Sequence, residues 1–327
     1  MTHLEISEFE VPPGRVGWRL DRFVAASLEG ESRSSVARLL EDGKVELNGV
    51  VAKASSLRLK EGDLLKVSVP VVEFNVDLPE PCDIPLDVLF EDDGVLLVSK
   101  QPGLVVHAGA GNEQDTLVNA LVHRYGGGDG FACQFDDPGR PGIVHRLDKW
   151  TSGCLVTAKT QKSLDFLSSA FKKRIVGKVY LAVLKGCFDR SSGVVDAPIA
   201  RHPVRRRKMA VSKDGKPAVS RWRVLGEGGT PEKPMSLVEI VLETGRTHQI
   251  RVHMASIGHP VVGDVVYGGR RSELGAPRTM LHAWRLTIPL PSTGEKKEFV
   301  SPPPGDMLDF MEGNGLLEIF RGLESEE

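Results

Sequence analysis

Apolar positions in the first 70 residues change from helical to strand-like spacing along the chain. Apolar side chains recur at i, i+3, i+4 and i+8 over residues 20–28, and a second helical stripe runs over residues 32–43 between a serine N-cap and a glycine stop. Residues 45–51 alternate around an Asn-Gly pair, which is typical of a β-hairpin, and residues 64–70 alternate again. Two helices followed by a small sheet predict a compact domain over residues 14–72.

The remainder of the chain has many alternating segments and few helices. One amphipathic helix is predicted from the cap at Thr160 to about residue 174, and another begins near Thr247, after a tight turn at Gly245. Strands are predicted within residues 95–109, 153–159, 178–186 and 236–244. Because strands and helices do not alternate regularly, a doubly wound parallel sheet is not expected. The pattern predicts an α+β fold.

A stretch rich in proline and acidic residues separates these two parts. We therefore expect an N-terminal tail over residues 1–13, a small domain over 14–72, a linker over 73–85 and a larger domain over 86–327.

Composition agrees with a globular protein of this size, because 40% of the 327 residues are hydrophobic and 26% are charged. The four cysteines show no Cys-x-x-Cys spacing, no apolar run has the ~18 residues of a membrane span, and the first residues lack the apolar stretch of a signal peptide. We therefore expect a cytoplasmic protein with free thiols and no membrane association.

The net charge of −2 hides an uneven distribution. Residues 201–223 contain nine Lys and Arg against a single acid, whereas residues 73–93 contain eight acids and no base. Positive charge concentrated in one segment indicates a surface that binds a polyanion, although a solvated loop has the same composition.

The tripeptide Arg-Leu-Asp occurs twice. Asp21 follows an apolar helical position, so we expect it to face outward as a surface charge. Asp148 lies instead in a turn between two apolar strands, closed by Thr151 and its neighbours. A carboxylate that emerges between buried strands needs a cation beside it, so Asp148 is either a catalytic group or half of a structural ion pair.

Other kinds of site are not indicated. The glycine clusters match neither a phosphate-binding loop nor a dinucleotide fingerprint. His248 and His253 are five residues apart, which is not the spacing of a helical zinc pair. We expect no metal.

Several blocks together resemble one family. "GIVHRLDKWTSGCLVTAK" (residues 142–159) is similar to the signature of RluA/RluD-type RNA pseudouridine synthases. "QPGLVVH" (101–107), "KVYLAVLKG" (178–186) and "GRTHQIRVHMASIGHPVVGDVVYGG" (245–269) resemble the family's other blocks in order. Residues 14–72 are similar to the small RNA-binding domain named after ribosomal protein S-four. Trp150 stands where the family usually has a small polar or acidic residue.

The resemblance implies the pseudouridine synthase fold, with a mixed, largely antiparallel central sheet, and a cofactor-free isomerisation of uridine in RNA. It implies ribosomal RNA as the partner, and we expect a monomer. It assigns Asp148 as the catalytic carboxylate, Arg251 as its cationic partner and Tyr180 as the group that stacks on uracil; a core tyrosine is the alternative for Tyr180. Candidate RNA-binding residues are Arg146, His145, Thr151, Arg207, Arg33 and Lys44.

Two other functions remain open on the residues alone. The first is a non-catalytic RNA-binding protein that uses the small domain and the basic segment. The second is a glycoside hydrolase, which usually needs a second acid close to the first. The Asp148 turn is flanked by basic residues instead.

Overall fold

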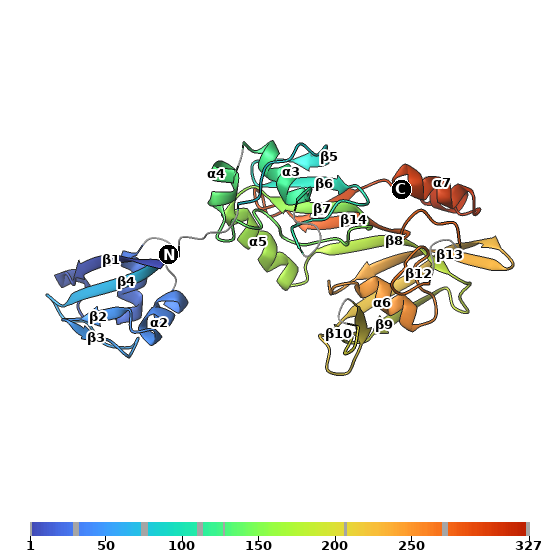
Figure 1. Cartoon of the computed structure of the whole chain (residues 1–327). Helices are drawn as coiled ribbons and strands as arrows, with labels where there is room; N and C mark the ends of the chain where they lie inside the picture. Colours follow the sequence, from blue (N-terminus) through green and yellow to red (C-terminus); the bar gives the residue numbers. More distant parts are fainter. Residues whose placement is uncertain are drawn as a thin grey trace. The chain divides into compact units, whose positions relative to one another are not determined.

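The computed structural model describes residues 2–28, 33–72, 78–109, 114–126, 128–205, 208–269 and 274–324. The chain forms two compact units, Met1–Val76 and Asp77–Glu327, each with its own hydrophobic core. Figure 1 shows the first unit in blue and the second from cyan to red.

The first unit combines two helices with a four-stranded antiparallel sheet in the order β1-β4-β2-β3. Apolar side chains of both helices and of β2 and β4 form its core. Its elements are β1 (Thr2–Glu10), a 3-10 turn (Pro13–Arg15), α1 (Leu20–Ser27), α2 (Arg33–Glu41), β2 (Val45–Leu47), β3 (Val50–Val51) and β4 (Leu64–Val72). The Asn48–Gly49 turn has positive φ at both residues, 52° and 79°, as a type I′ hairpin requires.

Two features of this unit differ from the sequence-based expectation. Residues 2–10, which we assigned to a tail, form strand β1 and pair with β4 along its whole length. Asp21 is buried rather than outward-facing, with 5% of its surface exposed. The reason is that the segment around Ser55 covers the start of α1 and accepts the Asp21 amide, while Arg19 donates to the Asp21 carboxylate at 3.1 Å. Ser32, the expected N-cap of the second helix, lies outside the described residues.

The second unit is built on a nine-stranded sheet in the order β5-β6-β7-β14-β8-β13-β12-β9, with β15 paired to β14. All its strand pairs are antiparallel except β7 with β14, so the expected α+β fold with a largely antiparallel sheet is confirmed. Its strands are β5 (Asp87–Glu91), β6 (Val95–Lys100), β7 (Ser152–Ala158), β8 (Gly177–Lys185), β9 (Ser192–Asp196), β12 (Val219–Thr230), β13 (Lys233–Leu242), β14 (Leu281–Pro289) and β15 (Lys296–Val300), with a separate hairpin of β10 (Ile199–Arg201) and β11 (Met209–Val211).

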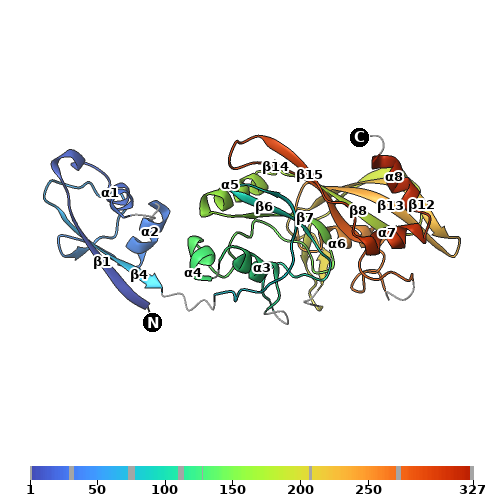
Figure 2. The same cartoon turned by 90° about the horizontal axis from the view of Figure 1, so that it is seen from above.

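Helices cover this sheet at both ends (Figure 1). They are α3 (Leu117–Arg124), α4 (Gly128–Phe131) with a 3-10 turn (Ala132–Gln134), α5 (Gln161–Lys172), α6 (Gln249–Ser256), α7 (Gly305–Glu312) and α8 (Leu317–Glu324). Thr160 caps α5 as predicted, since its hydroxyl accepts the Ser163 amide. Figure 2 shows α7 and α8 beside the sheet. Their apolar side chains, such as Met307 and Phe320, pack in one core cluster with side chains of β8, β13 and β14.

The described part of the expected linker also packs on this unit. The Asn119 side chain donates to the Glu80 carbonyl at 2.7 Å, and Leu78 and Ile84 join the core beneath α3.

The single parallel contact of the sheet lies beside the Asp148 turn. Ser152 and Gly153, which begin β7, pair with His282 and Ala283 of β14. Gly153 has a φ of +109°, and a Cβ there would lie 2.2 Å from the Ala283 carbonyl oxygen. Only glycine allows the two strands to approach this closely, and that approach fixes where the turn leaves the sheet.

Candidate active site

The turn that carries Asp148 is anchored at its backbone. The Thr151 amide donates to the Asp148 carbonyl at 3.0 Å and closes the turn. The Arg278 guanidinium, which is 2% exposed, donates to the Trp150 carbonyl at 3.0 Å and also pairs with Asp306. These contacts fix the backbone of the turn at the carbonyls of Asp148 and Trp150.

Lys100 at the end of β6 is a third anchor. Its side chain is 1% exposed, and its ammonium donates to the carbonyls of Gln101 and Leu104 at 2.9 Å and of Lys149 at 3.3 Å. Burial, with the nearby Arg278 charge, lowers the pKa of Lys100 to about 7. Lys100 thus ties the start of the 101–104 segment to the residue that follows Asp148.

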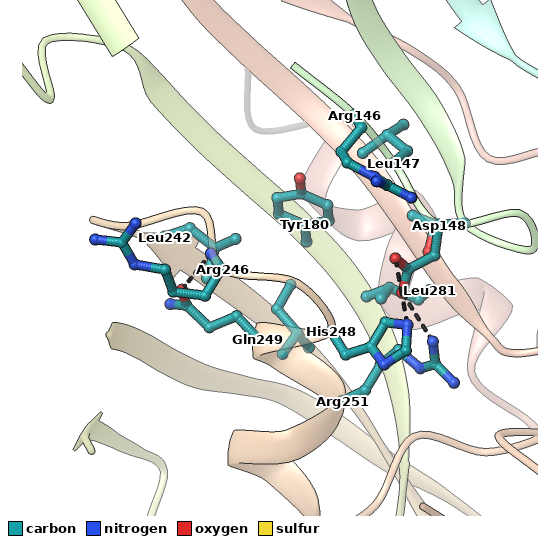
Figure 3. Close-up of a pocket in the computed structure, with 12 residues that line it drawn as sticks. Arg146, Leu147, Asp148, Tyr180, Leu242, Arg246, His248, Gln249, Arg251 and Leu281 are labelled. Atoms are coloured by element: carbon teal, nitrogen blue, oxygen red, sulfur yellow. Dashed lines mark hydrogen bonds and ion pairs between the residues drawn. The ribbon is translucent and has the colours of Figure 1, made fainter. Parts of the chain in front are cut away.

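Two carboxylates, those of Asp264 and Asp148, share the Arg251 guanidinium, and Figure 3 shows its pair with Asp148. Asp264 accepts from Nε at 2.6 Å and from Nη2 at 2.9 Å, and Asp148 accepts from Nη1 at 2.8 Å. The Asp264 side chain is fully buried, whereas 23% of the Asp148 side chain is exposed. Burial alone lowers the pKa of Arg251, but the bonds and charges of Asp264 and Asp148 outweigh it and raise that pKa. The buried Asp264 carboxylate therefore orients the permanently charged Arg251 guanidinium toward the partly exposed Asp148 carboxylate.

His248 lies near the other oxygen of the Asp148 carboxylate. Its Nε2 lies 3.9 Å from Asp148 Oδ1, and its Nδ1 lies 3.0 Å from the Tyr267 hydroxyl. The Met209 amide donates to that hydroxyl at 2.8 Å, so the tyrosine can give its own proton to Nδ1. The proton on the ring then sits on Nε2, facing Asp148. Burial lowers the pKa of His248, which favours this neutral form.

A pocket opens over the Asp148 carboxylate, with Tyr180 of β8 on its wall (Figure 3). Burial, followed by the Asp148 charge, raises the pKa of Tyr180 well above its usual range, so the phenol stays neutral. The volume of about 60 Å³ is far below the roughly 300–1,000 Å³ of cavities that enclose small ligands. The lining residues are Arg146, Leu147, Asp148, Thr151, Tyr180, Leu242, Arg246, His248, Gln249, Ile250, Arg251 and Leu281. A neutral aromatic ring beside an ion-paired carboxylate suits a flat, uncharged base.

Comparisons with known proteins identify the family. The model of the RNA pseudouridylate synthase family matches residues 94–256, and that of the S4 domain matches residues 18–65. The chain is 40% identical over 302 residues to ribosomal large subunit pseudouridine synthase D of Zymomonas mobilis, covering 89% of this chain and 92% of that protein. It is 38% identical over 314 residues to the protein of the same name from Escherichia coli K12, covering 92% of each. The chain belongs to the RNA pseudouridylate synthase family.

Solved structures agree. Human RNA pseudouridylate synthase domain containing 1 is 32% identical with a TM-score of 0.55, over 67% of this chain and 84% of that one. Human RNA pseudouridylate synthase domain containing 4 is 25% identical with a TM-score of 0.54, over 71% and 93%. This protein is therefore an enzyme that isomerises uridine to pseudouridine in RNA, and the interpretations as a non-catalytic RNA-binding protein or a glycoside hydrolase are set aside.

The structure of this pseudouridine synthase brings five of the candidate site residues into one pocket. Asp148, Arg251, Tyr180, Arg146 and the buried Thr151 all line it. Their roles in the reaction remain predictions.

His145 lies elsewhere. Its ring stacks on Phe171 with centroids 4.8 Å apart, and Nε2 accepts the Val156 amide at 3.0 Å, so it faces a neighbouring cavity. Burial lowers the pKa of His145 to about 3. Lys44 lies in the first unit, just before β2, and is partly exposed. The side chain of Arg33 and the whole of Arg207 lie outside what the structure describes.

Sequence reasoning missed the groups that support the pocket. Lys100, Arg278 and the pair of Asp264 and Tyr267 come from three separate segments. Lys100, Asp264 and Arg278 are buried and Tyr267 is half-buried, and only their contacts in the fold reveal them. The one usable signal was Lys100, a charged residue that directly ends an apolar strand.

The described residues contain neither a membrane-spanning helix nor a cluster of metal ligands. None of their helices is long and apolar enough to cross a membrane. They also contain no group of three His, Cys, Asp or Glu side chains placed to hold a metal ion.

Proposed function

We propose that this enzyme modifies uridines of large-subunit ribosomal RNA, and that the Asp148 carboxylate drives the reaction on a nucleotide turned out of the RNA. The observation that carries the catalytic part is the ion pair between Asp148 and Arg251 in a pocket walled by Tyr180. The names of the relatives support the ribosomal target.

The chemistry requires few groups. The bond from ribose carbon 1′ to uracil nitrogen 1 breaks, the freed base turns, and carbon 5 bonds to carbon 1′. The hydrogen on carbon 5 leaves as a proton and nitrogen 1 takes up a proton, so the isomerisation is redox-neutral and transfers no group from outside. A carboxylate can assist by covalent attack or by stabilising the activated sugar.

Each pocket residue has a role in this proposal. Arg251 fixes the Asp148 carboxylate in place through a charge-assisted hydrogen bond. The Tyr180 ring stacks on the uracil, and because its phenol is neutral it does not repel the uracil oxygens. The exposed Arg146 beside Asp148 fills the space that the base leaves in the RNA.

The size of the pocket supports base extrusion. The pocket has a volume of about 60 Å³ and only 23% of the Asp148 side chain is exposed, so a uracil stacked inside an RNA helix could not reach this carboxylate. Turning the nucleotide out costs a few kcal/mol of unstacking, which phosphate contacts of the basic segment 201–223 offset.

Tritium release tests this proposal. Large-subunit ribosomal RNA transcribed with uridine tritiated at carbon 5 is incubated with the wild type and with Asp148→Asn, and tritium in water is counted. Asparagine keeps an oxygen for Arg251 but cannot act as a carboxylate, so we expect the rate to fall by at least about a thousandfold.

The matched control is Asp309→Asn, which changes an exposed carboxylate on α7 and should leave the rate unchanged. Full activity of Asp148→Asn would refute the role of Asp148. A wild type that releases no tritium from this RNA, but does so from transfer RNA, would refute the ribosomal target alone.

A further inference from the structure

A second, larger cavity adjoins the pocket of Asp148. It has a volume of about 440 Å³ and lies between the Asp148 loop, the end of α5 and the start of β8. Arg146, Tyr180, Leu242 and Arg246 line both cavities, so the two are continuous along one wall. A polymer with one unit bound in the Asp148 pocket therefore has the larger cavity directly beside it.

The second cavity carries an excess of positive charge. Five cations line it, and its single acid, Glu243, is already paired with Arg221 at 2.7 Å. No ion pair joins any of the five to an acid within the described part of the chain. The cations are Arg146, Lys172, Arg174, Lys178 and Arg246.

Lys178 shows the effect of this gathered positive charge most clearly. It is half-buried on β8, and burial together with the charges of Arg174 and Arg246 lowers its pKa. Like charges gathered around a partly dry cavity repel each other, and an anion between them would turn that repulsion into attraction. A bound anion would therefore offset positive charge that no acid among the described residues neutralises.

Arg174 occupies a backbone position that normally favours glycine. It follows the C-cap of α5 in the left-handed region, with a φ of 59°. The Arg174 amide donates to the Phe171 carbonyl and the Ile175 amide to the Ala170 carbonyl, which is the Schellman arrangement. Replacing Arg174 with glycine removes the guanidinium and relieves the backbone at once.

We propose that this cavity binds the phosphodiester next to the target uridine. The inference rests on the proposed function, because it assumes that a uridine of an RNA chain occupies the Asp148 pocket. Because Arg146 and Tyr180 line both cavities, the backbone of a chain whose uridine occupies the Asp148 pocket has a direct path past them into the larger cavity. Guanidinium and ammonium groups are the side chains that bind phosphate oxygens best.

The experiment compares Lys178→Met and Arg174→Gly with a control, Lys162→Met, which removes an exposed cation at the opposite end of α5. Tritium release from the transcribed ribosomal RNA is measured at potassium chloride concentrations from about 50 to 200 mM, and thermal unfolding is recorded for each variant. Each lost phosphate contact should raise the RNA KM several-fold and lower the slope of log affinity against log salt by about 0.7.

Arg174→Gly guards against a folding artefact. Its Tm should equal or exceed that of the wild type, so a raised KM in this variant cannot come from a damaged fold. The control should show the wild-type KM and slope.

A wild-type KM and salt slope in Arg174→Gly, and in Lys178→Met where it folds, would overturn the cavity assignment and leave the proposed function intact. A wild type that releases no tritium from any RNA would instead overturn the proposed function, and the cavity assignment with it.

Discussion

Asp264 and Asp148 bind opposite parts of the Arg251 guanidinium, and only Asp148 reaches solvent. Asp264 also accepts the Val266 amide at 2.9 Å, so its carboxylate is fixed by the backbone as well. Burial alone raises the pKa of Asp264, but the bonds from Arg251 hold it below its usual range. An inner carboxylate held in this way acts as a positioning residue for the Arg251–Asp148 pair.

Asp264→Asn should therefore reduce kcat by about ten- to a hundredfold with little change in the RNA KM. The asparagine NH₂ group would face the Arg251 Nε, donor against donor, so the guanidinium would turn away from Asp148. Asp264 is 1% exposed and cannot contact RNA, so the RNA KM should stay close to that of the wild type. A rise in KM without loss of kcat, measured by tritium release beside the Asp309→Asn control, would contradict this role.

A buried histidine couples stability to pH. The His282 Nε2 lies 2.8 Å from the Ser301 carbonyl, to which it must donate, so Nδ1 accepts from the Ser152 hydroxyl at 2.9 Å. The ring is therefore neutral, and burial lowers the pKa of His282 to about 4. In the unfolded chain a histidine titrates near 6.5. Between these values the unfolded state binds a proton that the folded state does not.

The free energy of unfolding should consequently fall as the pH drops from about 6.5 to about 4, by roughly 1.4 kcal/mol per pH unit for this one group. The measurement is urea unfolding of the wild type and of His282→Asn across that range. The variant is less stable throughout, but its dependence on pH should be shallower by that amount. Parallel pH curves for the two proteins would show that His282 titrates normally in the fold.

At the scale of elements, one short turn is held by three distant parts of the sheet. Lys100 from β6, Arg278 ahead of β14 and the β7–β14 junction at Gly153 all fix the backbone that carries Asp148. None of these contacts involves the Asp148 side chain, so its carboxylate keeps its position while remaining open to the pocket.

Lys100→Met should test that anchoring. Methionine fills the same volume but removes the Lys100 donor from three carbonyls, of which that of Lys149 keeps the Gly103 amide, and this costs about 1–3 kcal/mol of stability. Because the turn would loosen at Lys149, kcat should fall while the RNA KM stays close to that of the wild type. The control is Lys159→Met at the far end of β7, which loses a comparable pair with Glu91 but should retain its kcat. Equal kcat in both variants would show that Lys100 contributes to stability but not to the position of Asp148.

The sequence was informative where local order carries the signal. The turn around Asp148, the helix cap at Thr160 and the Asn48–Gly49 hairpin each depend on neighbours in the chain, and each was predictable. Burial was not. Asp21 was misplaced on the surface because the segment that covers it, around Ser55, lies more than 30 residues away.

The same limit explains the missed supports of the site. Asp264 and Arg278 are charged residues in loop-like sequence, where solvent exposure is the ordinary expectation. They are buried only because Arg251 and Asp306 arrive from other elements to pair with them. The family resemblance supplied Arg251 and Tyr180, which spacing alone could not have linked to Asp148.

At the scale of the whole molecule, the residues proposed to carry out the reaction all belong to the second unit. Every residue that lines the Asp148 pocket lies between positions 146 and 281, and its anchor Lys100 is also in the second unit. The first unit carries the S4 match and its own closed core, and its strand β1 pairs only with β4 of the same unit. Removing residues 1–76 therefore takes away a complete sheet and cuts none of the strands around the site.

We expect the shortened chain, residues 77–327, to retain kcat within a few-fold and to show an RNA KM raised by at least about tenfold. If the S4 domain binds the same RNA chain as the second unit, its loss removes a tethered second contact without touching the reacting groups. Tritium release at saturating and at limiting RNA separates the two constants, and circular dichroism confirms that the sheet remains. An unchanged KM would mean that the second unit alone, through its basic segment, provides the RNA affinity. A lost kcat in a folded truncated chain would mean that the first unit helps to form the site.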